Sequence, residues 1–203
     1  MKKVIVISLI VIAVLIVGGV LFLFMIPGPD LSQFEHLKEP QISTKANQKV
    51  IAVEVKGNPN EVGSKAFGLL FKLYFKIKGA PKGPQQPAPR ARWPLSAETP
   101  QTEWIGWYAM PVPESVTELP DYKTEPGLKI ELTTWEYGEV AEILHIGPYD
   151  REELTIKKLE TFIKDKGYHI IGLHEEEYLK GPGMFFRGNP ETYYTIIRYQ
   201  IKK

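Results

Sequence analysis

The chain has 203 residues, of which 25 are basic and 24 acidic, so its formal net charge is only +1 at pH 7. A body this close to neutral lacks the basic surface of nucleic-acid-binding proteins, and we expect no nucleic-acid partner. The absence of cysteine excludes disulfides, thiolate catalysis and cysteine-ligated metal sites.

The N-terminal segment is strongly apolar. Residues 4–26 form an uncharged run of 23 residues behind Lys2 and Lys3, long enough as a helix to cross a hydrocarbon core of ~30 Å. Bulky residues stand where signal peptidase needs small ones, which favours an uncleaved anchor over a signal peptide. The two lysines predict a cytoplasmic N-terminus. We therefore expect a single-pass protein of the cell membrane with its body outside the cytoplasm.

These features divide the chain into three parts. Residues 1–29 are expected to form a cytoplasmic tip and transmembrane anchor, residues 30–47 a polar stalk, and residues 48–203 one globular domain. The domain itself reads as two halves, at about 48–112 and 128–203.

The first half begins with a β-branched strand at 50–55, which Gly57, Asn58 and Pro59 break. Apolar residues at helical spacing over 62–77 then predict a helix. Two further strands are expected, around 88–95 and at 103–112. The proline-rich stretch 79–102 is predicted to form a surface excursion, partly in polyproline conformation.

The second half repeats this order. A strand at 140–146 meets a break at Gly147 and Pro148, and a helix follows with Asp150 as the expected N-cap. Strands are predicted within 169–179 and at 193–202, and an additional strand at 128–135 leads into this half. Gly57 and Gly147 are 90 residues apart, as are the two final strands. We predict an α+β fold of two strand-helix-strand-strand units, with antiparallel sheets and two helices, behind one transmembrane helix.

Two motifs in the second half resemble a known family. They are His145-x-Gly147-Pro148-Tyr149 and Glu176-x-Tyr178-Leu179-x-x-Pro182. Together they resemble GyrI-like small-molecule-binding domains, which also serve as effector-binding domains of AraC- and MerR-type regulators. The resemblance covers about residues 48–203. It implies paired strand-helix-strand-strand units of the SHS2 type, with a ligand cleft between them.

The chain departs from that family near its end. Relatives often carry a glutamate and a proline where this chain has Ile196 and Gln200, so Glu176 is expected to be the remaining carboxylate of the cleft. Members of the family mostly bind amphipathic or cationic molecules. Some hydrolyse cyclopropane-containing toxins, and others with an N-terminal anchor act as autophagy adaptors.

Five residues are candidate ligand contacts: Trp104, Trp107, Tyr149, Glu176 and Tyr178. Aromatic faces can hold a cation, although strand aromatics often only fill a core. Trp104 and Trp107 are expected on opposite faces of their strand, so they cannot both line one cleft. Glu176 and Tyr178 share a face, where they could bind a cation together, or act as base and acid in a hydrolase. Exposed strand positions are the alternative interpretation for glutamates.

Other chemistry finds no support in the sequence. No cluster of histidines and carboxylates with metal-ligand spacing is evident, so no metal site is predicted. No phosphate-binding motif is present, and no cofactor is expected. Phe67, Phe71 and Phe75 form a second stripe on the first helix, which either contacts the membrane or is covered by the proline-rich stretch.

Three functions therefore remain open. The favoured one is non-catalytic binding of a small amphipathic or cationic molecule, to sense or to sequester it. The alternatives are a hydrolase of strained or electrophilic small molecules, with Glu176 and Tyr178 as catalytic residues, and an adaptor anchored through residues 4–26 for an unspecified protein partner.

Overall fold

The computed structural model describes residues 30–94, 100–123, 126–182 and 188–203. The expected anchor at 4–26 lies outside these residues. Within them, no helix has the length and apolar character needed to cross a membrane. This finding corrects the predicted placement in the cell membrane.

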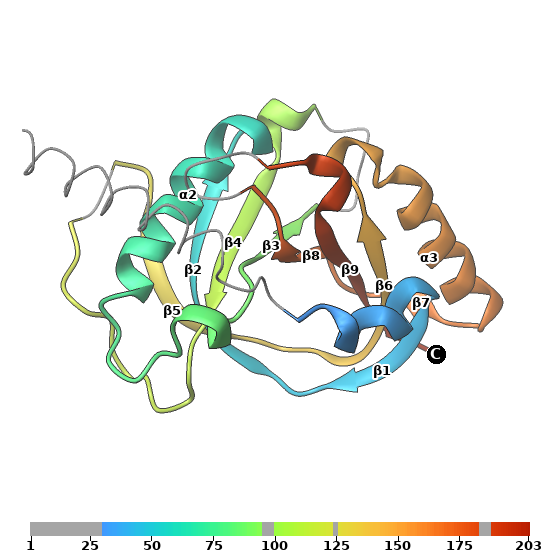
Figure 1. The fold of residues 1–203 in the computed structure, drawn as a ribbon, viewed down its shortest axis with the longest axis horizontal. Coiled ribbons are helices and arrows are strands. Elements are labelled where there is room, and N and C mark those ends of the chain that lie inside the picture. Colours follow the sequence, from blue (N-terminus) through green and yellow to red (C-terminus); the bar gives the residue numbers. More distant parts are fainter. Residues whose placement is uncertain (1–29, 95–99, 124–125, 183–187) are drawn as a thin grey trace, which may run out of the picture. The chain divides into compact units, whose positions relative to one another are not determined.

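The elements of residues 31–203 alternate between strands and helices (Figure 1). In chain order they are η1 (Ser32–Lys38), β1 (Gln41–Lys45), β2 (Gln48–Lys56), α2 (Pro59–Tyr74), η2 (Gly83–Gln85), β3 (Arg90–Trp93), η3 (Gln101–Glu103), β4 (Ile105–Pro111), β5 (Ile130–Trp135), β6 (Gly138–Ile146), η4 (Tyr149–Arg151), α3 (Glu153–Asp165), β7 (His169–Ile170), β8 (His174–Lys180), η5 (Pro190–Thr192) and β9 (Tyr194–Lys202).

The strands form one curled antiparallel sheet of nine strands, rather than the separate sheets expected from the sequence. Their order is β1-β6-β9-β8-β3-β4-β2-β5, with β7 paired to β9. Each half contributes a strand, an α-helix and returning strands, in the predicted order. The halves meet where β3 pairs with β8, with Ala91 opposite Glu176. This junction brings residues from both halves to the middle of the sheet.

A glycine forms the strand-to-helix corner in each half. Gly57 and Gly147 have φ angles of 138° and 144°, a region that residues with a β-carbon rarely adopt. After the first corner the Asn58 side chain accepts a hydrogen bond from the backbone N–H of Asn60, and Pro59 opens α2. Each corner turns its helix back over the strands of its own half, and both helices cover the same face of the single sheet.

The second helix begins differently from the prediction. Asp150 lies in the 3-10 turn η4 and caps nothing, and Glu152 occupies the N-cap position without a side-chain capping bond. Glu152 is 5% exposed. Its side chain is thus turned into the protein, under the start of α3.

The helix-covered face holds most of the apolar core. Leu70 and Leu73 of α2 pack on Ile51 and Tyr108, and Leu159 of α3 belongs to a second cluster with the odd-numbered residues of β9. Phe67 and Phe71 pack at the border of the first cluster, while Phe75 is exposed.

The opposite face carries a buried network of charges. Arg198, only 1% exposed, pairs with Glu142, Glu175 and Glu177. The Tyr137 hydroxyl donates to Glu175 at 2.8 Å. Because residues of a strand alternate between faces, Glu175 and Glu177 belong to this network, and Glu176 between them points to the helix side.

The predicted stalk is part of the folded body. Residues 41–45 form β1, which pairs with β6, and the Ser43 hydroxyl donates to Glu142 at 2.8 Å. Leu37 of η1 is buried against Leu144 and Ile196. Ile196 therefore faces away from Glu176, and the departure from the family pattern at this position removes no carboxylate from the side that bears Glu176.

Candidate functional site

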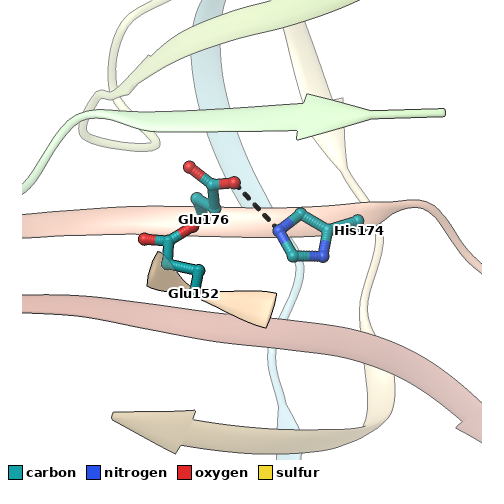
Figure 2. Close-up of side chains that lie close together, drawn as sticks. All are labelled: Glu152, His174 and Glu176. Atoms are coloured by element: carbon teal, nitrogen blue, oxygen red, sulfur yellow. Dashed lines mark hydrogen bonds and ion pairs between the residues drawn. The ribbon is translucent and has the colours of Figure 1, made fainter. Parts of the chain in front are cut away.

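The candidate site lies on the helix-covered side of β8, beside the junction of the two halves. His174, Glu176 and Tyr178 are two residues apart along the strand, so all three point to this side. Glu152 approaches them from the start of α3. Figure 2 shows the Glu152 side chain beside Glu176 and His174, with the carboxylates converging from two different elements.

Glu176 is held by two hydrogen bonds. Its Oε1 lies 2.9 Å from His174 Nε2, and its Oε2 accepts a hydrogen bond of 2.6 Å from the Tyr178 hydroxyl. Burial acts to raise the pKa of Glu176, but these contacts with His174 and Tyr178 outweigh it and lower the pKa below its ordinary value. Glu176 is therefore a largely buried carboxylate, 13% exposed, that is ionised at neutral pH.

Glu152 has the opposite character. Burial, and next to it the charge of Glu176, raise its pKa from 4.5 to about 9. Thr195 lies beside it and moderates this rise, yet Glu152 Oε1 has no hydrogen-bond partner among the described residues. At neutral pH the site thus contains one protonated and one ionised carboxyl group.

Buried polar atoms without a partner gather around this pair. The described residues contain four such side-chain atoms, and three of them are Glu152 Oε1, Thr195 Oγ1 and Tyr108 Oη. Tyr108 is close enough to Glu176 for that charge, after burial, to raise its pKa. Unpaired buried polar groups are rare in native proteins and mark places where a ligand group or ordered water is expected.

Aromatic rings surround the polar groups. Phe67 of α2 meets Tyr108 and Tyr178 edge-on, at centroid distances of 5.1 and 5.6 Å. Tyr149 lies 5.5 Å from Tyr178 and is 37% exposed, so it reaches from the site to the surface. A β-carbon at Gly181 would lie 2.5 Å from the Tyr149 hydroxyl. The two sequence motifs therefore meet in space.

The structure divides the five predicted contacts between two faces. Tyr149, Glu176 and Tyr178 lie together, and Trp104 packs near them through Trp93, at 6.2 Å between ring centroids. Trp107 instead packs on the opposite face of the sheet and lines an open hollow of about 770 Å³, which is bordered by β2, β4, β5 and residues 127–129. Trp107 and Glu176 therefore lie on opposite faces of the sheet and do not share a site.

The expected cleft does not coincide with two hollows that the described residues form. Neither the hollow at Trp107 nor a second one of about 490 Å³ beside Val62 and Lys65 is lined by Glu176 or Tyr178. In the described part of the chain, the site around Glu176 is a closely packed cluster, and the exposed edge of Tyr149 connects it to solvent.

Sequence reasoning missed three of the residues at the site. His174 could have been found, because a histidine and a glutamate two apart on a strand share a face. Tyr108 shares its strand face with Trp104, a predicted contact, so strand alternation could have indicated it. Glu152 gave no signal, since a glutamate in the first turn of an amphipathic helix is ordinarily exposed. The sequence indicated no cluster of histidine and carboxylates, yet Glu152, His174 and Glu176 form one.

Known proteins of similar structure share the fold of this chain. No family model and no curated protein matches it. An uncharacterized conserved protein from Listeria innocua superposes with a TM-score of 0.69 at 21% identity, over 86% of this chain and all of its own. A hydrolase from Listeria innocua gives a TM-score of 0.64 at 20% identity, over 81% and 92% of the two chains.

A domain of a DNA-bound protein has the same fold. The C-terminal domain of EcmrR superposes with a TM-score of 0.58 at 12% identity, over 81% of this chain and 98% of that domain. EcmrR has also been solved in complex with DNA. The fold of this chain is thus one that occurs both in the C-terminal domain of EcmrR and in a protein described as a hydrolase.

Proposed function

We propose that the protein is a GyrI-like domain, built from two strand-helix-strand-strand units, that binds a small amphipathic or cationic molecule beside Glu176. It binds without chemical change, to sense or to sequester the molecule. The observation that carries this proposal is the largely buried, ionised Glu176, beside aromatic rings and three buried polar atoms without partners among the described residues. The two motifs at 145–149 and 176–182 support it.

The chemistry of the site favours a cation with an apolar body. Glu176 supplies the negative charge, and a cation over the ring of Tyr149 or Tyr178 gains roughly 0.5–2 kcal/mol, depending on desolvation. Apolar ligand surface buried against Phe67 adds about 25 cal/mol per Å², less the cost of ordering the complex. Tyr149 is the side chain that must move, because it lies between Tyr178 and solvent.

Melting-temperature shifts test this function. A ligand that prefers the folded state stabilises it in proportion to RT ln(1 + [L]/Kd). We expect the full chain to be stabilised by rhodamine 6G, a lipophilic cation, and not by fluorescein, an anion of similar size and ring system. Equal shifts with both dyes, or none with a panel of lipophilic cations, would reject the proposal.

A hydrolase is the second candidate, and one observation favours it. Neighbouring carboxyl groups with opposite pKa shifts are the arrangement that enzymes use for an acid and a base. Glu176 would act as the general base: it would accept a proton from a water molecule while the oxygen of that water attacks an electrophilic carbon of the substrate. Glu152 would give its proton to the leaving atom, with Tyr178 orienting the base. Turnover of an activated ester or a cyclopropane by the full chain, lost in Glu176→Gln, would place this function ahead of simple binding.

A further inference from the structure

Three side chains at the site offer metal-ligating atoms within reach of one another. One nitrogen of His174 and one carboxylate oxygen each from Glu152 and Glu176 all lie within 4.8 Å of each other. Figure 2 shows His174 and Glu176 on one strand, joined by a dashed line, with the Glu152 side chain beside Glu176. His174 and Glu152 are buried, at 8% and 5% exposure.

The type of ligand fits a borderline transition-metal ion. Zinc binds imidazole nitrogen and carboxylate oxygen at about 2.0–2.2 Å, and sites with three protein ligands leave a further position open. His174 Nε2 and Glu176 Oε1 are already 2.9 Å apart, close to the spacing that two ligands of one ion require.

The groups behind the ligands are oriented as in metal sites. Ligating histidines usually donate their second ring N–H to an acceptor, which fixes the ring and its tautomer. His174 Nδ1 lies 3.0 Å from the Tyr199 hydroxyl, which itself donates to Glu160 at 3.4 Å. The Tyr199 hydroxyl can therefore accept a hydrogen bond from Nδ1–H of His174, and in that tautomer the lone pair of Nε2 is available to an ion. Tyr178 orients Glu176 by donating a hydrogen bond to its Oε2.

An independent observation points to a bound group here. Glu152 is more than nine-tenths buried, and its Oε1 has no partner among the described residues. The hydroxyls of Tyr108 and Thr195 are buried close by and are also unpaired. Structural carboxylates in a core are normally paired, as Glu175 is on the other face of the same strand. An ion would satisfy Glu152, with its open position toward the unpaired hydroxyls.

We propose that Glu152, His174 and Glu176 bind one divalent transition-metal ion of the zinc class. The ion and an organic cation compete for Glu176, but the metal site does not depend on the function proposed above. Its ligand set includes His174, to which that function assigns no contact, and it uses Glu152 as a metal ligand rather than as a neutral carboxyl group.

Metal titration of the full, untagged chain tests the proposal. The protein is first treated with chelator, which is then removed. Calorimetry with Zn²⁺ should show one ion bound per chain. Co²⁺ bound in its place should give the visible absorption of a four-coordinate site. Glu152→Gln and His174→Gln should each weaken Zn²⁺ binding at least tenfold, and Tyr199→Phe about tenfold, as outer-shell changes commonly do. Glu153→Gln, the exposed neighbour on α3, is the matched control and should bind as wild type does.

The possible results distinguish the metal proposal from the proposed binding of an organic cation. If no Zn²⁺ binds, or if Glu152→Gln and His174→Gln both bind it as tightly as wild type, the proposal is overturned, and the second result assigns the ion to surface histidines. Melting curves of both variants serve as the control that they are folded. Rhodamine 6G binding in the presence of chelator reports on the proposed function alone, so either idea can fail without the other.

Discussion

Replacing Glu152 by glutamine should make the protein more stable at neutral pH. Glutamine has the same shape and cannot ionise. The groups facing Glu152 are Glu176 and His174 on β8, Thr195 on β9 and the phenol of Tyr149. The nearest charge is that of Glu176, which disfavours a second negative charge on Glu152. The wild-type residue therefore has to keep its proton in the folded state.

The size of the effect follows from the two pKa values. The pKa of Glu152 is about 9 in the folded protein, against an ordinary value of 4.5. Between these values the folded state holds one proton that the unfolded chain releases, so stability is full below about pH 4.5 and falls as pH rises toward 9. Each pH unit costs about 1.4 kcal/mol. At pH 7 the wild type has lost about 3 kcal/mol that Glu152→Gln retains.

Urea denaturation from pH 5 to pH 8, with chelator present, measures this difference. The two proteins should be nearly equal at pH 5 and should diverge by more than 1 kcal/mol per pH unit above it. Glu153→Gln should follow the wild type across the range, since that side chain is exposed. A Glu152→Gln protein that is less stable at pH 7, or that shows the wild-type pH dependence, would refute the reasoning.

Three further changes probe the surroundings of the site. Arg198→Met should lower the free energy of unfolding by about 3 kcal/mol in urea, because Glu142, Glu175 and Glu177 lose their shared cation and keep one other basic partner each, Lys45, Arg92 and Arg90; an unchanged urea midpoint would contradict this role. Tyr178→Phe should raise the pKa of Glu176, seen by carbon NMR of its carboxyl group, since the 2.6 Å bond is lost. Gly106→Ala should cost about 1–3 kcal/mol, because its β-carbon would lie 2.4 Å from the Trp93 ring; tryptophan fluorescence should report the displaced ring.

The parts of the fold that follow local rules could be read from the sequence. Helical spacing over 62–77 located α2 (Pro59–Tyr74) to within three residues, and the glycine corners located both strand-to-helix turns. Alternation along β8 correctly placed Glu176 and Tyr178 on one face. Each of these depends on neighbouring residues alone, and the repeat of the pattern gave the order of elements in the second half.

Contacts between distant segments could not be predicted in this way. Residues 41–45 look like a polar linker, and only their pairing with β6 makes them a strand. Glu152 has the context of an exposed first-turn residue, and the packing of the helix start against β8 and β9 buries it. Trp107 was grouped with Glu176 by composition, although strand alternation and the covering helices put the two on opposite faces.

The affinity of Glu176→Gln for a lipophilic cation tests the central claim most directly. Fluorescence anisotropy of rhodamine 6G with the full chain, in chelator, gives the Kd for the wild type, for Glu176→Gln and for the exposed control Glu153→Gln. Loss of a buried charge partner is worth at least about 1.4 kcal/mol, so Kd should rise tenfold or more in Glu176→Gln and stay unchanged in the control. Equal affinity of all three proteins would show that the cation does not bind at Glu176.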